Sequence, residues 1–280
     1  MNYRHAFHAG NFADLIKHAI LTRLLRELTA GAAPLTVIDT HAGAGLYDLR
    51  GDLSRRTGEG EAGIGRLMAA IDAPNAFDDL KAAVRRGNAP KEARYYPGSP
   101  VLIANALRPR DRYIACELHP DDHAALKQVL PRELGAVVHK GDGWVHASTV
   151  APFSPAALLV LVDPPFERGD DYVQALDLLI AILKVNSGAT LAIWLPIKDL
   201  ATYDAFLGDI EDAAAGHAVL AAEVRLRPLT DPMRLNGCAV IVVNPPPGLE
   251  TQARAAADWI ATRIGEDGAL GRVTMVGGRA

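Results

Sequence analysis

The sequence has little cysteine, no long apolar run and no strong excess of either charge. Its two cysteines, Cys116 and Cys238, both lie inside apolar stretches, which predicts buried thiols in a reducing compartment rather than a disulfide framework. No stretch approaches the roughly 18 consecutive apolar residues of a membrane-spanning helix. The first residues also carry no apolar signal core. These absences favour a cytoplasmic protein with no membrane partner.

The formal net charge of −4 excludes a uniformly basic chain, although a local basic patch for nucleic acid remains compatible with it. The pairs His5-x-x-His8 and His119-x-x-x-His123 have spacings that a metal site can use. Neither pair comes with cysteines or a matching carboxylate motif, so we expect no metal. A length of 280 residues allows one large or two modest domains. No sustained heptad or spare apolar face is visible, which favours a monomer.

The most informative stretch begins with the apolar run 158–162, which is typical of a strand buried on both faces of a parallel sheet. It ends in Asp163, Pro164, Pro165 and Phe166. Neither proline can donate to a strand ladder, and each fixes its own φ near −65°. The strand therefore ends at the acid, in the crevice where open α/β sheets bind ligands. A carboxylate, a rigid carbonyl and a flat ring there suit a planar group that carries an amino substituent.

Other strand ends carry further polar groups. The run 35–39 leads into His41, Gly43 and Gly45, a turn in which the backbone can approach a ligand closely. The second predicted strand ends near Glu117, where Rossmann-like folds bind ribose hydroxyls. The third ends at Asp142-Gly143, which is either an adenine-binding acid or a plain turn. The full G-x-G-x-x-G fingerprint is absent, and this favours a nucleoside cofactor without a pyrophosphate over NAD.

The N-terminal region predicts a helix over residues 13–28, with Asn11 or Asp14 as its cap and Gly31 at its end. Lys17 and His18 fall in its first two turns. A cation there opposes the helix dipole, which indicates a function for Lys17. The alternative, a solvated lysine beside a surface histidine, is equally compatible with this segment.

Residues 46–95 interrupt the α/β rhythm and predict an inserted helical subdomain. The segment is polar and Gly-rich at first, with Arg50, Arg55 and Arg56, and then shows helical apolar spacing. A structureless loop of this length is improbable. Its cations suggest a clamp for a polyanionic substrate, and a solvated insertion is the alternative. Ser99 after the insertion is expected to cap a helix with Pro100 at its first position.

The whole pattern predicts an α/β fold with seven strands in one sheet. Residues 1–45 and 96–280 form the main domain, preceded by a helical tail at the N-terminus. The segments 222–227 and 237–246 are expected to form a final antiparallel pair. A helix over 249–264 follows, and the Gly-rich last dozen residues are expected to fray.

Taken in order, these motifs resemble those of the S-adenosylmethionine-dependent amino-methyltransferases, which carry (Asn/Asp/Ser)-Pro-Pro-(Tyr/Phe) after the fourth strand. The opening Tyr3-Arg-His-Ala-Phe-His, the Asp39-Thr-His-Ala-Gly-Ala-Gly, the Tyr95-Tyr-Pro-Gly-Ser-Pro and the Glu117-Leu-His-Pro extend the likeness over nearly the whole chain. Together with Val162-Asp-Pro-Pro-Phe-Glu they are similar to the bacterial RlmJ family. This resemblance implies a class I, Rossmann-like methyltransferase fold. It also implies N6 methylation of one adenine in 23S ribosomal RNA, before the subunit is fully assembled.

The family's site residues carry over where its motifs match. The resemblance implies a catalytic site made of Asp163, Pro164, Pro165, Phe166 and Lys17. It places S-adenosylmethionine, and its product S-adenosylhomocysteine, among His18, His41, Gly43, Ser99, Glu117, Asp142, Gly143 and Asp163. It brings the RNA to Tyr3, Arg4 and His5. One departure is Phe166 where tyrosine is common, which keeps a stacking ring and loses a hydroxyl.

The chemistry of the motif leaves other substrates open. An exocyclic amino group whose hydrogens are held by Asp163 and the Pro164 carbonyl can present its lone pair to a methyl donor, and Phe166 can stack on the base. DNA adenine or cytosine methylation uses the same pocket chemistry, but no separate large target-reading domain is visible. A protein glutamine methylase usually begins the motif with Asn rather than Asp. A non-catalytic RNA-binding factor is disfavoured by the intact motif.

Overall fold

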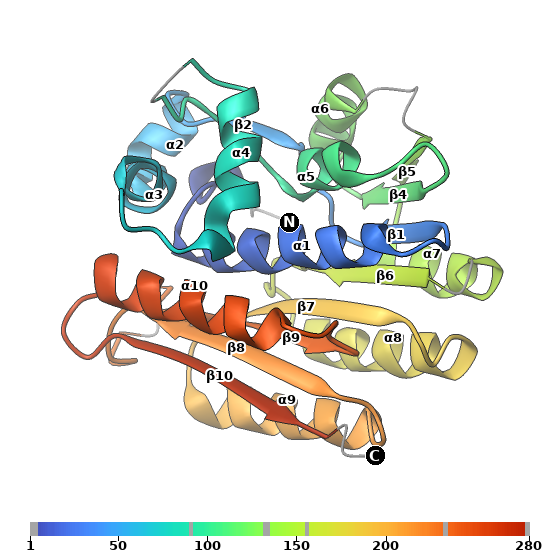
Figure 1. Ribbon diagram of the computed structural model, residues 1–280. Coiled ribbons are helices and arrows are strands. Elements are labelled where there is room, and N and C mark those ends of the chain that lie inside the picture. The colour runs from blue at the N-terminus through green and yellow to red at the C-terminus, as the bar shows by residue number, and fades with distance from the viewer. Residues whose placement is uncertain (1–4, 90–91, 131–134, 155–156, 232–234, 278–280) are drawn as a thin grey trace.

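The computed structural model describes residues 5–89, 92–130, 135–154, 157–231 and 235–277. Within these ranges a single large sheet has the strand order β10-β8-β9-β7-β6-β1-β4-β5 (Figure 1). Five of its strands are parallel: β1 (Leu35–Asp39), β4 (Arg112–Glu117), β5 (Ala136–Lys140), β6 (Ala157–Val162) and β7 (Thr190–Ile197). The predicted α/β fold is thus confirmed, and the parallel strands bring their carboxyl ends to one edge.

The other end of the sheet is antiparallel. Strand β9 (Gly237–Val243) lies between β7 and β8 (Val219–Arg225) and runs against both, which confirms the predicted antiparallel pair. The prediction of seven strands is wrong, because β10 (Leu270–Val276) adds an eighth beside β8. These residues were expected to fray. Instead, β-branched residues and Arg272, whose Nε donates to the buried Glu223 carboxylate at 2.8 Å, hold them on the sheet.

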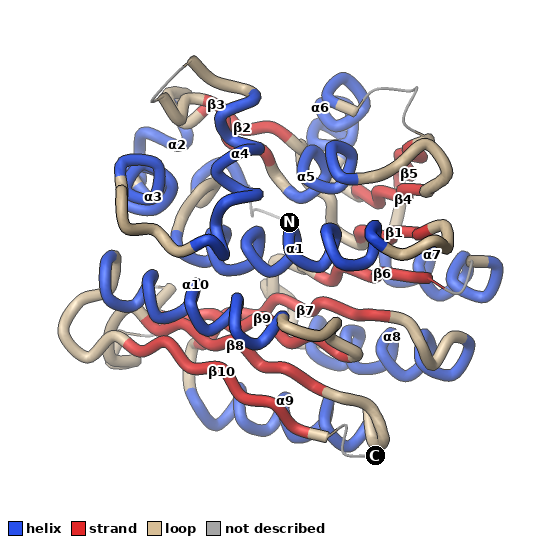
Figure 2. The backbone as a smooth tube through the Cα atoms, viewed as in Figure 1, coloured by secondary structure: helices blue, strands red, loops and turns tan. Residues whose placement is uncertain are grey.

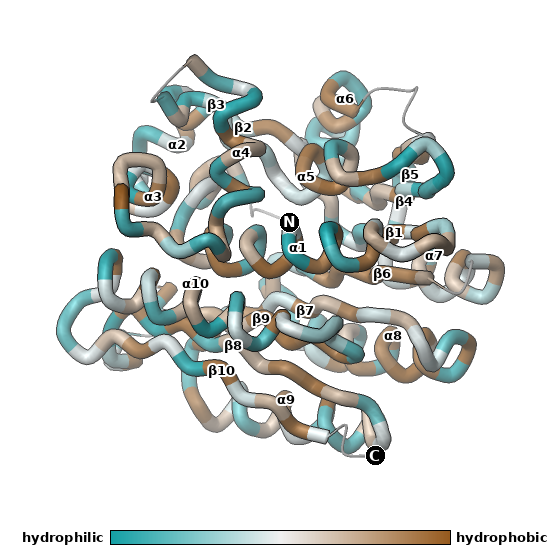
Figure 3. Tube along the Cα trace, in the orientation of Figure 1, coloured by the Kyte–Doolittle hydropathy of each residue, from teal (hydrophilic) through white to brown (hydrophobic). Residues whose placement is uncertain are grey.

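Helices cover both faces of the sheet, as the tube in Figure 2 shows. One face carries α1 (Phe12–Ala30), α5 (Ser99–Ala106), α6 (Pro120–Val129) and α10 (Leu249–Arg263), whose apolar residues share one core cluster. The opposite face carries α7 (Gly143–Val150), α8 (Asp171–Val185) and α9 (Leu200–Ala213) over a second cluster. Figure 3 shows hydrophobic residues along β6 and β8, as burial between two helical layers requires. Both cysteines are buried and free, as predicted.

Helix α1 begins where the sequence predicts a cap. The Asn11 side chain accepts hydrogen bonds from the backbone N–H groups of Ala13 and Asp14, and Gly31 follows the last turn. At α5 the prediction is wrong. Gly98 is the N-cap, and Ser99 is the first helical residue, because its hydroxyl donates to Asp39 at 2.9 Å instead of capping. Within the described ranges, no helix is both long enough and apolar enough to span a bilayer.

Residues 46–95 start and end in a short antiparallel pair, β2 (Leu46–Asp48) and β3 (Tyr95–Pro97). Between them lie α2 (Asp52–Thr57), the π-helical η2 (Glu61–Gly65), α3 (Arg66–Ala69), η3 (Asn75–Phe77) and α4 (Asp78–Arg86). Buried side chains of this segment, such as Phe77 and Leu80, belong to the same core cluster as α1 and α10. Ile71, part of the predicted apolar pattern, is fully exposed. The segment therefore packs directly on the main sheet's helical layer.

Candidate active site

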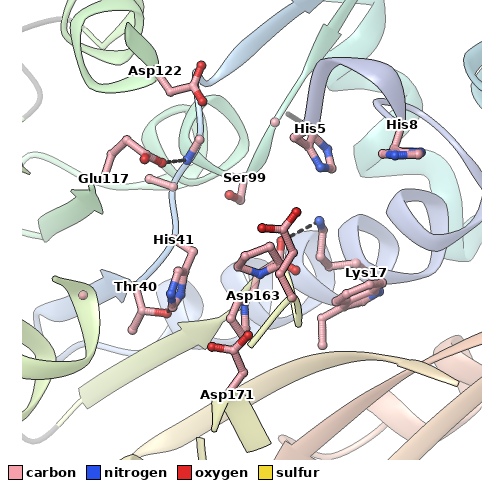
Figure 4. Close-up of a pocket in the computed structure, with 18 of the residues that line it drawn as sticks. His5, His8, Lys17, Thr40, His41, Ser99, Glu117, Asp122, Asp163 and Asp171 are labelled. Carbon is pink, nitrogen blue, oxygen red and sulfur yellow. Dashed lines mark hydrogen bonds and ion pairs between the residues drawn. The ribbon is translucent and has the colours of Figure 1, made fainter. Parts of the chain in front are cut away.

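A cavity of about 660 Å³ opens at the carboxyl ends of β1, β4, β5 and β6. It brings together most of the residues singled out from the sequence, namely His5, Lys17, His18, His41, Gly43, Ser99, Glu117, Asp142, Gly143, Asp163, Pro164 and Pro165. Figure 4 shows Asp163 between two groups, with Glu117 and His41 on one side and Lys17 and His5 on the other. Tyr3 and Arg4 lie outside the described residues.

The turn after β1 approaches Glu117 closely. Gly43 adopts a φ of +67°, and a Cβ built there would lie 2.5 Å from the Tyr47 hydroxyl, so only glycine fits. Its backbone N–H donates to Glu117 Oε2 at 2.8 Å, and His119 N–H donates to Oε1 at 2.6 Å. Burial raises the pKa of Glu117, while these two backbone donors oppose the rise. The carboxylate is thus held at the end of β4, facing the cavity.

The turn after β5 is equally tight. A Cβ on Gly143 would lie 1.9 Å from the Thr40 carbonyl oxygen, so α7 can begin against the β1 turn only with glycine. Asp142 caps α7, with its Oδ1 accepting from Trp144 N–H at 2.8 Å and from Val145 N–H at 3.3 Å. The His41 ring packs edge-on against Trp144, with centroids 4.8 Å apart. Asp142-Gly143 is therefore a helix start on the cavity wall and not a plain turn.

Asp39 is a buried carboxylate at the end of β1. The hydroxyls of Ser99 and Tyr113 both donate to its Oδ2, at 2.9 and 3.2 Å. Its Oδ1 is buried with no partner among the described residues. Burial raises its pKa to about 7, although the hydroxyl donors lower it. Within the described ranges, no cation forms an ion pair with this carboxyl group.

Lys17 is buried, with 4% of its surface exposed, so the alternative of a solvated lysine is wrong. Its ammonium group bridges two carboxylates, at 2.8 Å from Asp14 Oδ1 and 2.7 Å from Asp163 Oδ2. Burial lowers the pKa of Lys17, but attraction to both carboxylates raises it well above its usual range. Burial acts on Asp14 in the opposite sense, and attraction to His5 and Lys17 brings its pKa well below the usual range. The cluster thus holds ionised groups in a buried site.

His18 is also buried, which excludes the alternative of a surface histidine. Its Nδ1 lies 2.6 Å from the Tyr96 hydroxyl, and burial lowers its pKa to about 3. The imidazole is therefore neutral at physiological pH. Its Nε2 has no hydrogen-bond partner within the described part of the chain. A buried, unpartnered ring nitrogen on a cavity wall is suited to a polar ligand.

Phe166 points away from the cavity. It has a φ of +48°, which bulky residues rarely adopt, and it is 4% exposed. Its ring packs against Tyr172 and Trp194, with centroids 4.7 and 6.1 Å away. Lys198 Nζ donates to its carbonyl oxygen at 3.3 Å. Trp194, by contrast, lines the cavity beside Lys17. Stacking of Phe166 on a base stays a prediction, and it requires this ring to leave its packed position.

Sequence reasoning missed several cavity residues. Tyr47 reaches it from β2, Trp194 reaches it from β7, and Asp14 was considered only as a helix cap. Tyr96 on β3 is buried and supports the cavity residue His18 through its hydroxyl. The spacing of Asp14 and Lys17, three residues apart on one helix, was the available signal for a buried ion pair. No sequence spacing indicates the others. No group of three potential metal ligands is assembled among the residues that the structure describes.

The strand order and the cavity at the carboxyl ends of the parallel strands define a Rossmann-like fold of the class I methyltransferase type. Residues 32–276 match the model of the family described as "Ribosomal RNA large subunit methyltransferase D, RlmJ". The chain belongs to this family.

Individual relatives agree with this assignment. The chain is 32% identical over 264 residues to ribosomal RNA large subunit methyltransferase J of Escherichia coli K12, covering 94% of each chain. The Haemophilus influenzae protein of the same name is 32% identical over 269 residues, with 96% and 95% coverage. Protein LPL1258 from Legionella pneumophila has a similar structure, with a TM-score of 0.86, 28% identity and coverage of 95% and 98%. A probable spermidine synthase from Corynebacterium glutamicum shares the fold, at a TM-score of 0.52 and 11% identity.

Proposed function

We propose that this protein transfers a methyl group from S-adenosylmethionine to the N6 amino group of one adenine in 23S ribosomal RNA. The observation that carries the proposal is the placement of Asp163. It ends a central parallel strand inside the cavity, with Oδ2 bound to Lys17. Its Oδ1 accepts no hydrogen bond from any described residue and remains available to an amino group. Family membership supports ribosomal RNA as the substrate class.

The residues present fit the cofactor. Glu117 is suited to the ribose hydroxyls, and Asp142-Gly143 is suited to the adenine. The buried Nε2 of His18 makes no hydrogen bond within the described ranges and offers a polar contact. Gly43 and Gly143 keep the walls clear of side chains, while His41 and Ser99 complete the set. When bound, S-adenosylmethionine supplies an electrophilic methyl group and leaves as S-adenosylhomocysteine.

The chain's own residues activate the acceptor. The N6 lone pair of adenine is delocalised into its ring, which makes the amino group a poor nucleophile. Asp163 Oδ1 and the Pro164 carbonyl each accept one N6 hydrogen, and this favours a pyramidal nitrogen with a localised lone pair. After transfer, Asp163 takes the surplus proton from the methylated nitrogen. Pro165 restricts the backbone of the segment 163–166. Much of the rate therefore comes from geometry that is fixed before the reaction.

The base must leave its helix to reach Asp163. The cavity accepts an unpaired or flipped-out nucleotide, and a stacked ring contributes about 1–3 kcal/mol per base. Phe166 supplies this stacking once it has moved out of its contact with Tyr172. Single-stranded or loop RNA is therefore the preferred presentation, which is consistent with methylation before the subunit is fully assembled.

A basic surface near the N-terminal segment is suited to the RNA backbone. The α2 side chains Ser54 and Thr57 hold the carbonyl groups of Ala6 and Phe7. On the same helix Arg55 and Arg56 are exposed, and the described residues give neither of them an ion pair. With Arg50, Tyr3, Arg4 and His5 they form the RNA side of the proposal, which makes residues 46–95 a substrate-side subdomain. We propose that the enzyme acts as a cytoplasmic monomer.

The test is to incubate the protein with methyl-labelled S-adenosylmethionine and, separately, deproteinised 23S RNA, assembled large subunits, DNA and a protein extract. We expect label in 23S RNA alone or most strongly, recovered as N6-methyladenosine after digestion to nucleosides. Label in DNA, in cytosine or in glutamine would overturn the substrate assignment.

The matched variant is Asp163→Ala. It should abolish transfer to RNA while the affinity for S-adenosylmethionine, measured by calorimetry, stays measurable. Turnover near the wild-type rate would contradict the role of Asp163 as the acceptor of the N6 hydrogen.

A further inference from the structure

The first turn of α1 carries a buried carboxylate for which the proposed reaction has so far given no role. Asp14 is 2% exposed. Its Oδ2 accepts from Gly10 N–H at 2.8 Å and lies 3.0 Å from His5 Nε2. Its Oδ1 lies 2.8 Å from Lys17 Nζ. Its carboxylate thus contacts two cavity residues, His5 and Lys17, in addition to the Gly10 backbone.

Asp14 is not needed as the helix cap. Asn11 already accepts the N–H groups of Ala13 and Asp14, and no described helical N–H group donates to the Asp14 carboxylate. Burying a carboxylate costs free energy unless it is paired. The pairing with Lys17 and His5 therefore accounts for its position better than helix stability does.

Lys17 depends on both of its carboxylates for its place. Its ammonium group stands on a flexible four-carbon stem, and Asp163 lies 146 residues away in sequence. Contacts of 2.8 Å and 2.7 Å on two sides fix Nζ between Asp14 and Asp163. The ammonium thereby occupies Asp163 Oδ2 and leaves Oδ1 without a donor among the described residues. If Asp14 were neutral, Nζ would keep a charged partner on one side only, and its contact with Asp14 would weaken to a hydrogen bond with a neutral oxygen.

We propose that Asp14 is a positioning residue for methyl transfer. It holds Lys17 Nζ against Asp163 Oδ2, so that Oδ1 stays aimed at the acceptor amino group. The inference rests on the proposed function, because it concerns the orientation of Asp163. In this proposal Asp14 acts on the transfer through Lys17 and has no direct part in the reaction.

The variant Asp14→Asn keeps the shape of the side chain and removes its charge. We expect the rate of methyl transfer at saturating substrates to fall about ten- to a hundredfold, as for a small misplacement of a reacting group. The affinity for S-adenosylmethionine should change little. The rate should also acquire a descending limb toward alkaline pH where the wild-type rate is flat. Lys17, buried and left with one carboxylate, then loses its proton more readily.

The other ionisable groups around Lys17 do not produce this limb. His18 on the same helix is neutral because burial lowers its pKa to about 3. Burial raises the pKa of Tyr47 on β2 and that of Cys238 on β9 above their ordinary values. His5 faces Asp14 from the N-terminal segment, so the control variant must disturb that segment without touching Lys17.

Glu59→Gln is that control. The Glu59 carboxylate holds His8 at 3.0 Å and Asn11 at 2.9 Å, and so anchors the same N-terminal segment. It makes no contact with Lys17. If Asp14→Asn acted by loosening this segment, Glu59→Gln would reproduce its pH profile. We expect no alkaline limb in the control, and its appearance there would overturn the inference.

A second readout needs no methyl transfer. The Lys17 Cε resonance, assigned with Lys17→Met, can be titrated by NMR in the wild type and in Asp14→Asn. A lower Lys17 pKa in the variant is the expected result, and an unchanged titration would contradict the coupling. An altered titration with an unchanged transfer rate would also overturn the positioning role. Failure of the wild type to methylate RNA would count against the proposed function instead.

Discussion

The two buried carboxylates on either side of the cavity behave in opposite ways. Asp39, at the end of β1, accepts hydrogen bonds from the hydroxyls of Ser99 and Tyr113, and burial raises its pKa to about 7. Burial would do the same to Asp14, on the acceptor side, but attraction to His5 and Lys17 brings its pKa well below the ordinary range. The side proposed for the cofactor, which contains Gly43, Glu117, Asp142 and Gly143, is assembled mainly from tight turns and from backbone N–H groups that donate to carboxylates. The side proposed for the acceptor is assembled from an ion pair within α1, Asp14 with Lys17, and from Asp163, which lies 146 residues further along the chain than Lys17.

This difference predicts that substitutions on the two sides will have different effects. A backbone hydrogen bond from Gly43 to Glu117 connects two neighbouring turns, and Asp142 caps the start of α7. A change there should weaken cofactor binding and spare the acceptor chemistry. The acceptor side depends on Lys17, which balances two buried carboxylates. Loss of that one charge should affect both stability and turnover.

Lys17→Met should have the largest effect, because it leaves Asp14 and Asp163 without their shared cation. Removing one member of a buried ion pair costs about 3–5 kcal/mol, and we expect a loss of this order in the free energy of unfolding by urea. Methyl transfer should fall with it. Lys184→Ala, which removes an exposed lysine on α8, is the control. A Lys17→Met protein as stable as this control would contradict the buried network.

Gly143→Ala should disturb the turn proposed to bind the cofactor. The new Cβ would collide with the Thr40 carbonyl, and relieving the overlap should cost roughly 1–3 kcal/mol of stability. It should also lower the affinity for S-adenosylmethionine in calorimetry. Gly169→Ala provides the matched control, since a Cβ there meets nothing within 4 Å. Equal cofactor affinities for the two variants would show that the tight turn is not part of the site.

The pH dependence of stability should differ in sign between the two carboxylates. The folded-state pKa of Asp14 is lowered, so its contribution is present above its unfolded pKa and is lost as pH falls through the folded value. The folded-state pKa of Asp39 is raised to about 7, so its contribution is present below its unfolded pKa and is lost as pH rises through about 7.

The measurement is the free energy of unfolding by urea for the wild type, Asp14→Asn and Asp39→Asn, over a pH range from acidic to neutral. The advantage of the wild type over Asp14→Asn should shrink on acidification, and its advantage over Asp39→Asn should shrink toward neutral pH. If both stability differences changed in the same direction with pH, the contrast between Asp14 and Asp39 would be contradicted.

The smallest effect is expected outside the cavity. If Arg55 and Arg56 contact RNA phosphates, replacing each by alanine should reduce the slope of log affinity against log salt by about 0.7 for single-stranded RNA. Filter binding over a salt series measures this, with Lys184→Ala as the charge-matched control. A slope that stays the same in the double variant would place the RNA on another surface.

The cofactor side could be predicted from sequence because its signals are local. The apolar run before Asp39, the Gly43 turn and the acid that ends β4 each follow from a few adjacent residues. The same holds for the strand that ends before Asp163. By contrast, β10 was missed because its place at the edge of the sheet depends on pairing with β8, which lies far from it in sequence.

The acceptor side could not be predicted in this way. The contact between Lys17 and Asp163 joins residues 146 positions apart, and only folding brings them together. The sequence indicated an unusual lysine near a helix N-terminus but not that it is buried. The inward packing of Phe166 depends on Tyr172 and Trp194, which lie on other elements. No local pattern specifies that orientation.

The most direct test of the account compares Asp163→Asn with Glu117→Gln in single-turnover methylation of deproteinised 23S RNA over a range of S-adenosylmethionine concentrations. Asp163→Asn should bind the cofactor and transfer its methyl group about 10²- to 10⁴-fold more slowly, as expected for loss of a general base. Glu117→Gln should need more cofactor and then reach nearly the wild-type rate. A wild-type rate for Asp163→Asn, or a defect in Glu117→Gln that saturation does not relieve, would contradict the division of the cavity into these two sides.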